Sequence, residues 1–361
     1  SSMDYSICMF NLILQSAKIK TGKLDANASS PDGEYPFFTC SKEPLKISSY
    51  SYDCECVLVA GNGDLNVKYY NGKFDAYQRT YIIEDNSNGR LYLPYLYYFM
   101  NGYVEELRKL SIGGVIKYIK LRNLTDALIE LPDIETQKYI VSILSKIKEL
   151  IGCRYQELKI LENLIKARFV EMFGNGHDGF CNTKKLGEFC KFQQGTQIPV
   201  EEQIEEQLEG YTRFLRIIDY TQAPQIPRYV SVKGREIAKD SVVIVRYGAT
   251  AGFVGHGYAG ILANNLFEVV PDESILSKDF LYLALKYGTF EQEVHDKAFG
   301  AAMPALSFGM MNDIGVVTPN STAQNGFVDF VKQVDKSKAT VQKALDETQL
   351  LFDSLMQQYF G

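Results

Sequence analysis

The chain has 361 residues, of which 46% are hydrophobic, so it can bury a sizeable core and is expected to form more than one domain. Its 38 Lys and Arg are outnumbered by 44 Asp and Glu, and the net charge of −6 argues against a uniformly basic surface for nucleic acid, although local basic faces stay open. The seven cysteines include no CxxC pair and the three histidines lie far apart, so we expect reduced thiols and no metal site. The sequence shows no signal peptide and no apolar run long enough to cross a bilayer, and we therefore expect a cytoplasmic protein.

Residues 1–130 are predicted to form a first α+β globular part with a small, strongly bent sheet. An amphipathic helix is predicted at residues 93–110. Asn71-Gly72 is typical of a hairpin turn. Residues 61–63 (GNG) follow a strand pattern and precede another, so we interpret them as a turn and not as a cofactor-binding loop. The strand-like runs cover residues 35–40, 55–60, 65–70 and 79–84.

Residues 131–176 are predicted to form a long spacer helix, with its helical pattern at 134–173. Apolar residues recur there at alternating spacings of three and four, which indicates a heptad seam that packs against another helix. A helix of this length is a rod of roughly 60 Å, which suits a spacer better than a domain core. The predicted seam residues are Ile140, Leu144, Ile147, Ile151, Leu158, Leu161 and Ile165.

Residues 177–318 are predicted to form a second globular part with the same plan, followed by a second long helix at 319–361. An amphipathic helix is predicted at 280–297, and the glycine-rich residues 248–252 lack the Lys-Ser/Thr of a phosphate loop, so they are interpreted as a tight turn. The strand-like runs cover residues 214–219, 241–247 and 266–270. The seam residues of the second helix are Phe327, Val331, Val334, Val341, Leu345, Phe352 and Leu355.

The two halves of the chain are copies of one module. Adding 187 to a residue number in the first half gives its counterpart in the second half, with no gap over the second part of each copy. Matched pairs are Gly113 and Gly300, Asp126 and Asp313, Pro132 and Pro319, Gln137 and Gln324, and Phe173 and Phe360. An internal repeat of this kind suits a ligand that has two separate halves.

The order of several short motifs resembles the specificity subunit of type I restriction-modification systems. These motifs are KLGEF at residues 185–189, GAAMPALS at 300–307, LPDIETQ at 131–137 and the Phe-Gly pair at the end of each long helix. The resemblance covers essentially the whole chain, because the order of these motifs is duplicated in its two halves.

The resemblance implies an α+β fold with two globular target recognition domains related by pseudo-two-fold symmetry. Two long antiparallel helices, forming a coiled coil, separate them and set the gap between the halves of a bipartite, asymmetric DNA site. It also implies a chain that has no catalysis of its own and that joins two methyltransferase subunits and, in the nuclease form of the complex, restriction subunits. No cofactor is then expected in this chain, since S-adenosylmethionine, ATP and Mg²⁺ belong to those partners.

Base readout needs Arg, Lys, Asn, Gln, Ser or Thr on loops, and phosphate contacts need Lys or Arg beside them. For each candidate, a solvated surface position is the alternative. The candidates in the first globular part are Lys18, Lys20, Lys23, Asn62, Asn66, Lys68, Lys73 and Arg79. Those in the second are Arg213, Arg216, Lys233, Arg235, Arg246, Tyr247, Thr250, Asn264 and Lys297.

Polar residues in the predicted seam are either wet positions or devices that select one helix register. With the helices antiparallel end to end, Lys338 is expected near Glu157. The other polar members are Gln137, Arg154, Arg168, Gln324 and Thr348. Two further functions are weighed against DNA recognition: a freestanding DNA methyltransferase, which needs a cofactor site in this chain, and a coiled-coil scaffold that binds only protein.

Overall fold

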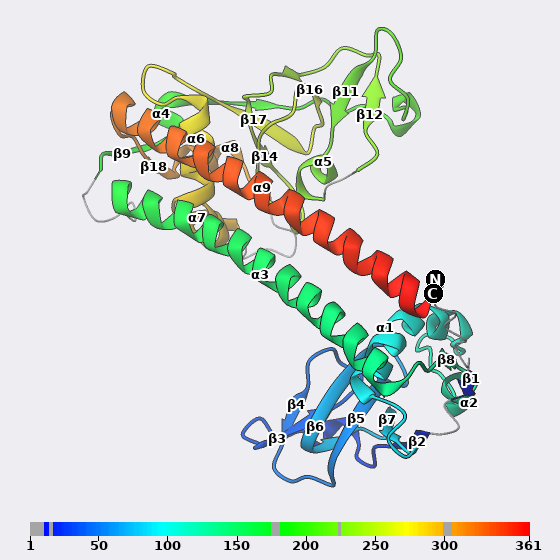
Figure 1. Cartoon of the computed structure of the whole chain (residues 1–361). Coiled ribbons are helices and arrows are strands. Elements are labelled where there is room, and N and C mark those ends of the chain that lie inside the picture. The colour runs from blue at the N-terminus through cyan, green and yellow to red at the C-terminus, as the bar shows by residue number, and fades with distance from the viewer. Residues whose placement is uncertain (1–10, 14–16, 175–180, 223–224, 299–304) are drawn as a thin grey trace, which may run out of the picture. The chain divides into compact units, whose positions relative to one another are not determined.

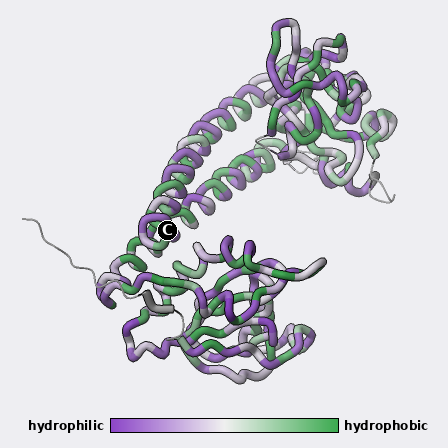
Figure 2. The backbone as a smooth tube through the Cα atoms, turned by 90° about the vertical axis from the view of Figure 1, so that its right-hand side faces the viewer, coloured by the Kyte–Doolittle hydropathy of each residue, from purple (hydrophilic) through white to green (hydrophobic). Residues whose placement is uncertain are grey.

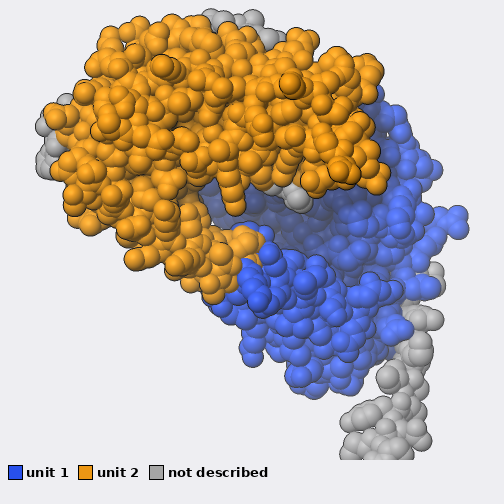
Figure 3. All heavy atoms as spheres, turned by 90° about the horizontal axis from the view of Figure 1, so that it is seen from above, with its two compact units in different colours: residues 1–155, 343–361 blue, residues 156–342 orange. Residues whose placement is uncertain are grey.

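The computed structural model describes the chain except for residues 1–10, 14–16, 175–180, 223–224 and 299–304 (Figure 1). The chain divides into two compact units, residues 1–155 with 343–361 and residues 156–342 (Figure 3). Each unit therefore contains one α+β domain and a part of each long helix. Among the described residues, every helix is either too short or too polar to span a bilayer.

The first unit is built on a six-stranded sheet with the strand order β2-β7-β5-β6-β3-β4. Neighbouring strands are antiparallel except for the parallel pair β3 and β6. Its strands are β2 (Ala17–Thr21), β3 (Tyr35–Phe38), β4 (Leu45–Ile47), β5 (Tyr52–Ala60), β6 (Val67–Ala76) and β7 (Thr80–Asp85). The long strands β5 and β6 join what would otherwise be two separate groups of strands.

The prediction of a hairpin turn at Asn71-Gly72 is wrong. Both residues lie inside β6, where they pair with Glu55 and Cys54 of β5. A glycine inside a strand often marks a bend or a bulge, and Gly72 has a φ of +138°, which other residues rarely adopt. The connection between β5 and β6 is the segment 61–66 instead, so residues 61–63 form a turn, as predicted.

The core of the first unit lies between this sheet and the helix α1 (Leu93–Leu110). Val57 and Val59 of β5 are fully buried, as are Leu96 and Met100 of α1. Burial of such side chains from water is the main favourable term in folding. Smaller elements complete the unit, namely β1 (Asn11–Ile13), which pairs with β8 (Leu128–Glu130), α2 (Leu121–Thr125) and the 3-10 helix η2 (Ala26–Ala28).

The second unit has two four-stranded sheets, with the orders β10-β17-β14-β15 and β12-β11-β16-β13. The strands of the first are β10 (Cys190–Gln194), β14 (Val242–Val245), β15 (Val254–Gly255) and β17 (Leu266–Pro271). Those of the second are β11 (Thr212–Leu215), β12 (Arg228–Val230), β13 (Glu236–Ile237) and β16 (Gly260–Leu262). Outside these sheets lie β9 (Thr183–Lys185), paired with β18 (Gly315–Val317), α4 (Leu186–Phe189), α8 (Phe308–Asn312) and the 3-10 helix η3 (Val200–Glu202).

Two predictions for the second unit are corrected. The run 214–219 is only partly a strand, because α5 (Ile217–Thr221) begins where the Asp219 carboxylate accepts from the Arg216 backbone N–H and caps the helix. The single helix expected at 280–297 is two helices, α6 (Lys278–Tyr287) and α7 (Phe290–Ala298). Gly288 ends α6 with an extended backbone, which a helix cannot continue.

The two domains share the pairing of several strands, although the single sheet of the first domain corresponds to two sheets in the second. The antiparallel triplet β2-β7-β5 corresponds to β10-β17-β14, and the parallel pair β3 and β6 corresponds to β11 and β16. The helices α1 and α6 each pack on the sheet of their own domain. The internal repeat read from the sequence is therefore a structural repeat.

The long helices are α3 (Ile134–Phe173) and α9 (Ser321–Phe360), and they pack against each other in antiparallel fashion within each unit. In the first unit the start of α3 and the end of α9 share one core. In the second unit the ring of Phe169 lies 5.4 Å from that of Phe327 near the start of α9. Hydrophobic and hydrophilic positions alternate along both helices (Figure 2). All fourteen predicted seam residues are buried or half-buried.

The helix register differs slightly from the expected one. The Lys338 ammonium group lies 2.6 Å from a carboxylate oxygen of Glu162 and forms an ion pair with it. Glu162 lies further along α3 than Glu157, the expected partner. Glu162 also accepts a hydrogen bond from the Tyr287 hydroxyl at 2.9 Å and lies 3.6 Å from the Lys286 ammonium group. Burial acts to raise the pKa of the Glu162 carboxyl, but the hydrogen bond from Lys338 and the nearby charge of Lys286 outweigh it and lower that pKa.

Gln137 does not act as a polar position between the two long helices. Its side chain anchors the start of α3 to the domain beside it: its amide oxygen accepts from the Tyr92 backbone N–H at 2.8 Å. Its amide nitrogen donates to the carbonyl oxygens of Arg90 and Pro132, both at 2.8 Å. The side chain is fully buried, so all of its polar atoms depend on these partners.

Gln324 repeats this anchor at the start of α9. Its amide oxygen accepts from the Ser277 N–H at 3.0 Å, and its amide nitrogen donates to the carbonyls of Ile275 and Pro319, both at 2.9 Å. The sequence offset of 187 thus matches two residues that make the same three hydrogen bonds.

Candidate nucleic-acid interface

One end of the sheet in the first domain is assembled from four chain segments. The Gly22 N–H donates to the Thr80 carbonyl at 3.0 Å, and the Gly61 N–H donates to the Arg79 carbonyl at 2.8 Å. The Ile119 N–H donates to the Gly61 carbonyl at 2.9 Å. These bonds bring together the end of β2, the end of β5, the segment before β7 and the segment before α2.

The second domain repeats this assembly bond for bond. The Gly195 N–H donates to the Leu266 carbonyl at 3.0 Å, and the Arg246 N–H donates to the Asn265 carbonyl at 2.9 Å. The Leu306 N–H donates to the Arg246 carbonyl at 3.0 Å. Backbone groups hold both ends, and in the second domain a side chain adds to them, because Arg246 Nε donates to the Leu306 carbonyl at 3.1 Å.

Glycine is required at one position of each assembly. A Cβ atom on Gly22 would overlap the carbonyl oxygen of Ala76, and one on Gly195 would overlap that of Ala263. Backbone atoms cannot move away as a flexible side chain can, so only glycine allows this close approach. The two glycines therefore fix where the following residues leave the sheet.

In the second domain this arrangement gathers polar side chains into a group that we call the second sheet end. Its members are Gln194, Gln197, Arg246, Tyr247, Thr250 and Asn264. The Asn264 amide donates to Gln197 Oε1 at 3.4 Å, and the Arg246 guanidinium donates to Gln194 Oε1. The same guanidinium lies 4.9 Å from the Tyr247 ring centre. Arg, Asn and Gln are the side chains that recognise base edges by paired hydrogen bonds.

In the first domain the corresponding group, the first sheet end, contains Lys23, Asn62, Gln78, Arg79 and Tyr118. Lys23, Gln78 and Arg79 are exposed, and Asn62 is half-buried. Asn62 and Tyr118 form a backbone bridge, as Tyr247 and Ala305 do in the second domain. Both sheet ends therefore present a cation beside an amide and a tyrosine.

Two predicted arginines are held by a buried acid, although Arg216 lines one pocket together with Asn264 of the second sheet end. Arg216 donates through Nε to Asp219 at 3.0 Å, and Arg213 lies 3.6 Å from the same carboxylate. The Asp219 side chain is fully buried, so it needs these charges. Their main contribution is to hold α5 against β11.

Other predicted cations also face acids of their own domain. Arg235 pairs with Glu268, which is nearly buried and also accepts from the Ser241 hydroxyl at 2.7 Å. Lys20 pairs with Glu84; burial acts to lower the pKa of Lys20, but the hydrogen bond to Glu84 outweighs it and raises that pKa. Lys18 lies 3.9 Å from the same Glu84.

The remaining predicted residues do not join either sheet end. Asn66 donates to the carbonyls of Cys40 and Asp64, both at 2.8 Å, and so holds a loop. Burial lowers the pKa of the neighbouring Lys68. Lys73 lies over the ring of Tyr50 at 4.8 Å.

Lys233 is exposed on the segment before Gly234, which packs against Thr196 close to the second sheet end. Lys297 lies in α7, but its side chain is outside the described residues, as is most of the predicted motif at 300–307.

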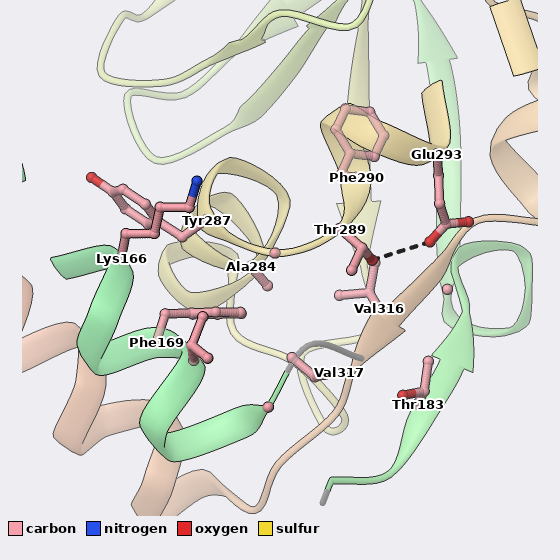
Figure 4. A pocket seen from close by; sticks show the side chains of 14 residues that line it. Lys166, Phe169, Thr183, Ala284, Tyr287, Thr289, Phe290, Glu293, Val316 and Val317 are labelled. Atoms are coloured by element: carbon pink, nitrogen blue, oxygen red, sulfur yellow. Dashed lines mark hydrogen bonds between the residues drawn. The ribbon is translucent and has the colours of Figure 1, made fainter. Parts of the chain in front are cut away.

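No metal site is found among the residues that the structure describes, since no group of three or more His, Cys, Asp and Glu side chains is placed there to hold an ion. A cavity of about 260 Å³ in the second unit is lined mainly by apolar groups, including Phe169, Phe290 and Val316 (Figure 4). Its polar lining includes Thr289, which donates to Glu293. None of the predicted DNA-contacting residues lines this cavity.

Sequence reasoning missed Gln78, Tyr118, Gln194 and Gln197. A signal for two of them was present, because QQGTQ at residues 193–197 places glutamines on both sides of the glycine that ends a strand. Gln78 and Tyr118 occupy the structural positions of Asn264 and Ala305, but the offset of 187 pairs Gln78 with Asn265 and Tyr118 with an alanine, so the sequence repeat did not mark them.

Comparison with known proteins agrees with this repeat. The family described as "Type I restriction modification DNA specificity domain" matches residues 14–163 and again residues 181–348. The chain is 37% identical over 149 residues to the specificity subunit of the type I restriction enzyme EcoDI from Escherichia coli. That match covers 41% of this chain but only 33% of the relative. It is 20% identical over 323 residues to the MjaVIII specificity subunit from Methanocaldococcus jannaschii, covering 80% and 76% of the two chains.

Solved structures share the fold over the full length. The S subunit of a type I restriction-modification system from M. genitalium superposes with a TM-score of 0.63 at 19% identity, covering 100% of this chain and 98% of that one. A second structure, described as bearing on complex assembly and conformational transition of the type I R-M system, has a TM-score of 0.58 at 16% identity, with coverages of 96% and 98%.

Proposed function

The chain belongs to the family of type I restriction modification DNA specificity domains, and on this premise we propose that it reads the DNA target of a type I restriction-modification complex. Each domain would read one half of a bipartite, asymmetric site, and the paired helices would set the gap. The chain itself would carry no catalytic step.

The observation that carries the proposal is the duplicated sheet end. The two domains present the same backbone frame at their sheet ends, yet with different side chains: Asn62 and Gln78 in one, Tyr247 and Asn264 in the other. A shared frame with different polar groups is what two readers of unlike half-sites require. Hydrogen bonds from such groups to base edges distinguish the four base pairs in the major groove.

The proposed partners are two methyltransferase subunits and, in the nuclease form, restriction subunits. The long helix α3 leaves Ile160 and Leu164 exposed in the second unit, by 64% and 46%, and Tyr139 and Leu150 exposed in the first. Exposed apolar side chains on a helix support docking of another protein. S-adenosylmethionine, ATP and Mg²⁺ would be bound by those subunits and not by this chain.

The isolated chain is expected to bind DNA weakly. Its net charge is −6, and several cations of the second domain are paired with its own acids. Non-specific affinity for DNA comes mostly from Lys and Arg that replace counterions on phosphates. Partner subunits would therefore supply much of the affinity, while this chain supplies the choice of sequence.

The test is to express the chain with its methyltransferase subunit and to map modified adenines across the host genome by sequencing. One bipartite motif is expected. Arg79→Gln should relax or change only one half of it, and Arg246→Gln only the other half. Lys46→Ala, at an exposed position on β4, is the matched control and should leave the motif intact.

A methylation pattern without two separated halves would contradict the proposal, as would an Arg79→Gln variant that alters both halves equally. Binding of S-adenosylmethionine to the isolated chain would favour a freestanding methyltransferase instead. Failure of the assembled complex to bind DNA in a salt-dependent way would favour a scaffold that binds only protein.

A further inference from the structure

A short loop of the first domain is fixed in shape beside the first sheet end. We call residues 112–118 the tip loop. Ile112 and Tyr118 exchange two backbone hydrogen bonds, at 3.0 and 2.8 Å, and the Gly63 N–H donates to the Lys117 carbonyl at 3.0 Å. Gly113 has a φ of +122°, a conformation that side chains rarely allow. The tip loop is thus a built turn, attached to the segment that carries Asn62.

The end of the tip loop is apolar and fully exposed. Val115 has a relative exposure of 104% and Ile116 of 63%, and Ile112 at the base of the loop is also exposed. Scattered apolar residues are normal on protein surfaces. Val115 and Ile116 differ in being adjacent and in lying on a loop that backbone hydrogen bonds hold in place, which makes them a candidate contact surface.

Charge around the tip loop identifies the occupant. Lys117 follows the apolar pair directly, Lys120 lies just beyond the loop, and Lys23 belongs to the first sheet end; all three are exposed. Asp64, which follows the attached Gly63, lies within ion-pair distance of Arg108 and Lys42. The lysines therefore set the charge beside the apolar tip, which is unsuited to a basic or purely apolar protein surface. It suits a polyanion that also offers apolar faces, which is DNA with its phosphates outside and its stacked bases inside.

We propose that the tip loop is an apolar wedge, which presses Val115 and Ile116 against a base step in the half-site of the first domain while Lys117 and Lys120 contact the flanking phosphates. The proposal rests on the proposed function and deepens it, because it adds deformation of DNA to the reading of base edges. Apolar side chains inserted in this way unstack a step and kink the duplex, so sequences with easily unstacked steps are preferred.

The test uses the assembled methyltransferase complex and duplexes that carry the mapped bipartite site, with 2-aminopurine placed at successive positions of the relevant half. This base analogue becomes more fluorescent when it is unstacked. The wild-type complex is expected to raise its fluorescence at one step. The double substitution Val115→Ser with Ile116→Ser should abolish that rise and weaken binding about ten-fold.

Two control variants accompany the serine variant. Val115→Leu with Ile116→Leu keeps the tip apolar and should keep both signals. Leu128→Ser changes another exposed apolar residue of the same unit and should have no effect. A base that the methyltransferase extrudes would also raise fluorescence, but that signal would persist in the serine variant and is separated by it.

The outcomes separate this proposal from the proposed function. If the wild-type complex shows no preference for the mapped site, the proposed function fails. If it binds specifically and the serine variant matches it in both fluorescence and affinity, the wedge is refuted while the proposed function stands.

Discussion

Replacing Gln324 by leucine is the sharpest test of how the long helices are attached to the domains. The substitution keeps the approximate size of the side chain but removes all three of its hydrogen bonds, leaving Ser277 N–H and the carbonyls of Ile275 and Pro319 without that partner. Each such bond contributes about 1 kcal/mol net, and an unpaired buried group costs at least as much. The leucine recovers some of this through apolar burial, so we expect a loss of about 3 kcal/mol in the free energy of unfolding.

The assay is denaturant unfolding followed by circular dichroism. The two units are separate compact bodies, so the curve is to be fitted with two transitions. Gln324→Leu should lower the transition of the second unit, and Gln137→Leu that of the first. Gln333→Leu, an exposed position on the same helix α9, is the matched control and should change little. A loss for Gln324→Leu no larger than that of this control would refute the reasoning.

Three further outcomes are expected. The pKa of the Glu162 carboxyl is lowered in the folded protein, so its ionised form stabilises the fold above about pH 4.5, the ordinary pKa of this group. Wild-type stability should therefore fall as the pH drops below about 4.5 and the carboxyl becomes protonated. Glu162→Gln should make stability depend less on pH in this range, and an unchanged pH dependence would contradict the assignment. Arg235→Gln should destabilise the second unit by about 2 kcal/mol, since it leaves the carboxylate of Glu268 poorly compensated, yet should leave DNA affinity of the folded complex unchanged in a binding titration. Arg246→Gln should weaken binding of the mapped site about ten-fold or more, with a stability loss of at most about 2 kcal/mol from its hydrogen bonds to the Leu306 carbonyl and to Gln194. Equal loss of binding on an unrelated duplex would show that the residue does not read sequence.

The repeat and the helix seam were accessible from the sequence because both are periodic. The offset of 187 identified Gln137 and Gln324 as equivalent positions of the repeat. The spacing of three and four identified the apolar positions of α3 and α9 that become buried where the helices pack together. What these two glutamines do was not accessible, since their partners lie 45 to 49 residues away in the chain, apart from the nearby prolines.

The candidate site was predicted less completely for a related reason. A lone arginine in a sequence does not reveal whether an acid will face it: Glu268 lies 33 residues from Arg235. A local signal did exist for Arg216, because Asp219 follows it at the spacing of a capping box. A strand pattern in the sequence does show which residues lie next to the end of a strand. The predicted residues at the two sheet ends were found in this way, namely Lys23, Asn62, Arg79, Arg246, Tyr247, Thr250 and Asn264.

The way the sheet ends are held has a consequence for how such proteins change over generations. The frame relies on main-chain groups and on two close approaches at Gly22 and Gly195, whereas exposed side chains such as Arg79 and Asn264 add little to folding. Point mutations at those exposed positions can therefore change the preferred DNA sequence with almost no loss of folding stability. One half of the recognised DNA site could therefore change while the other half stays the same.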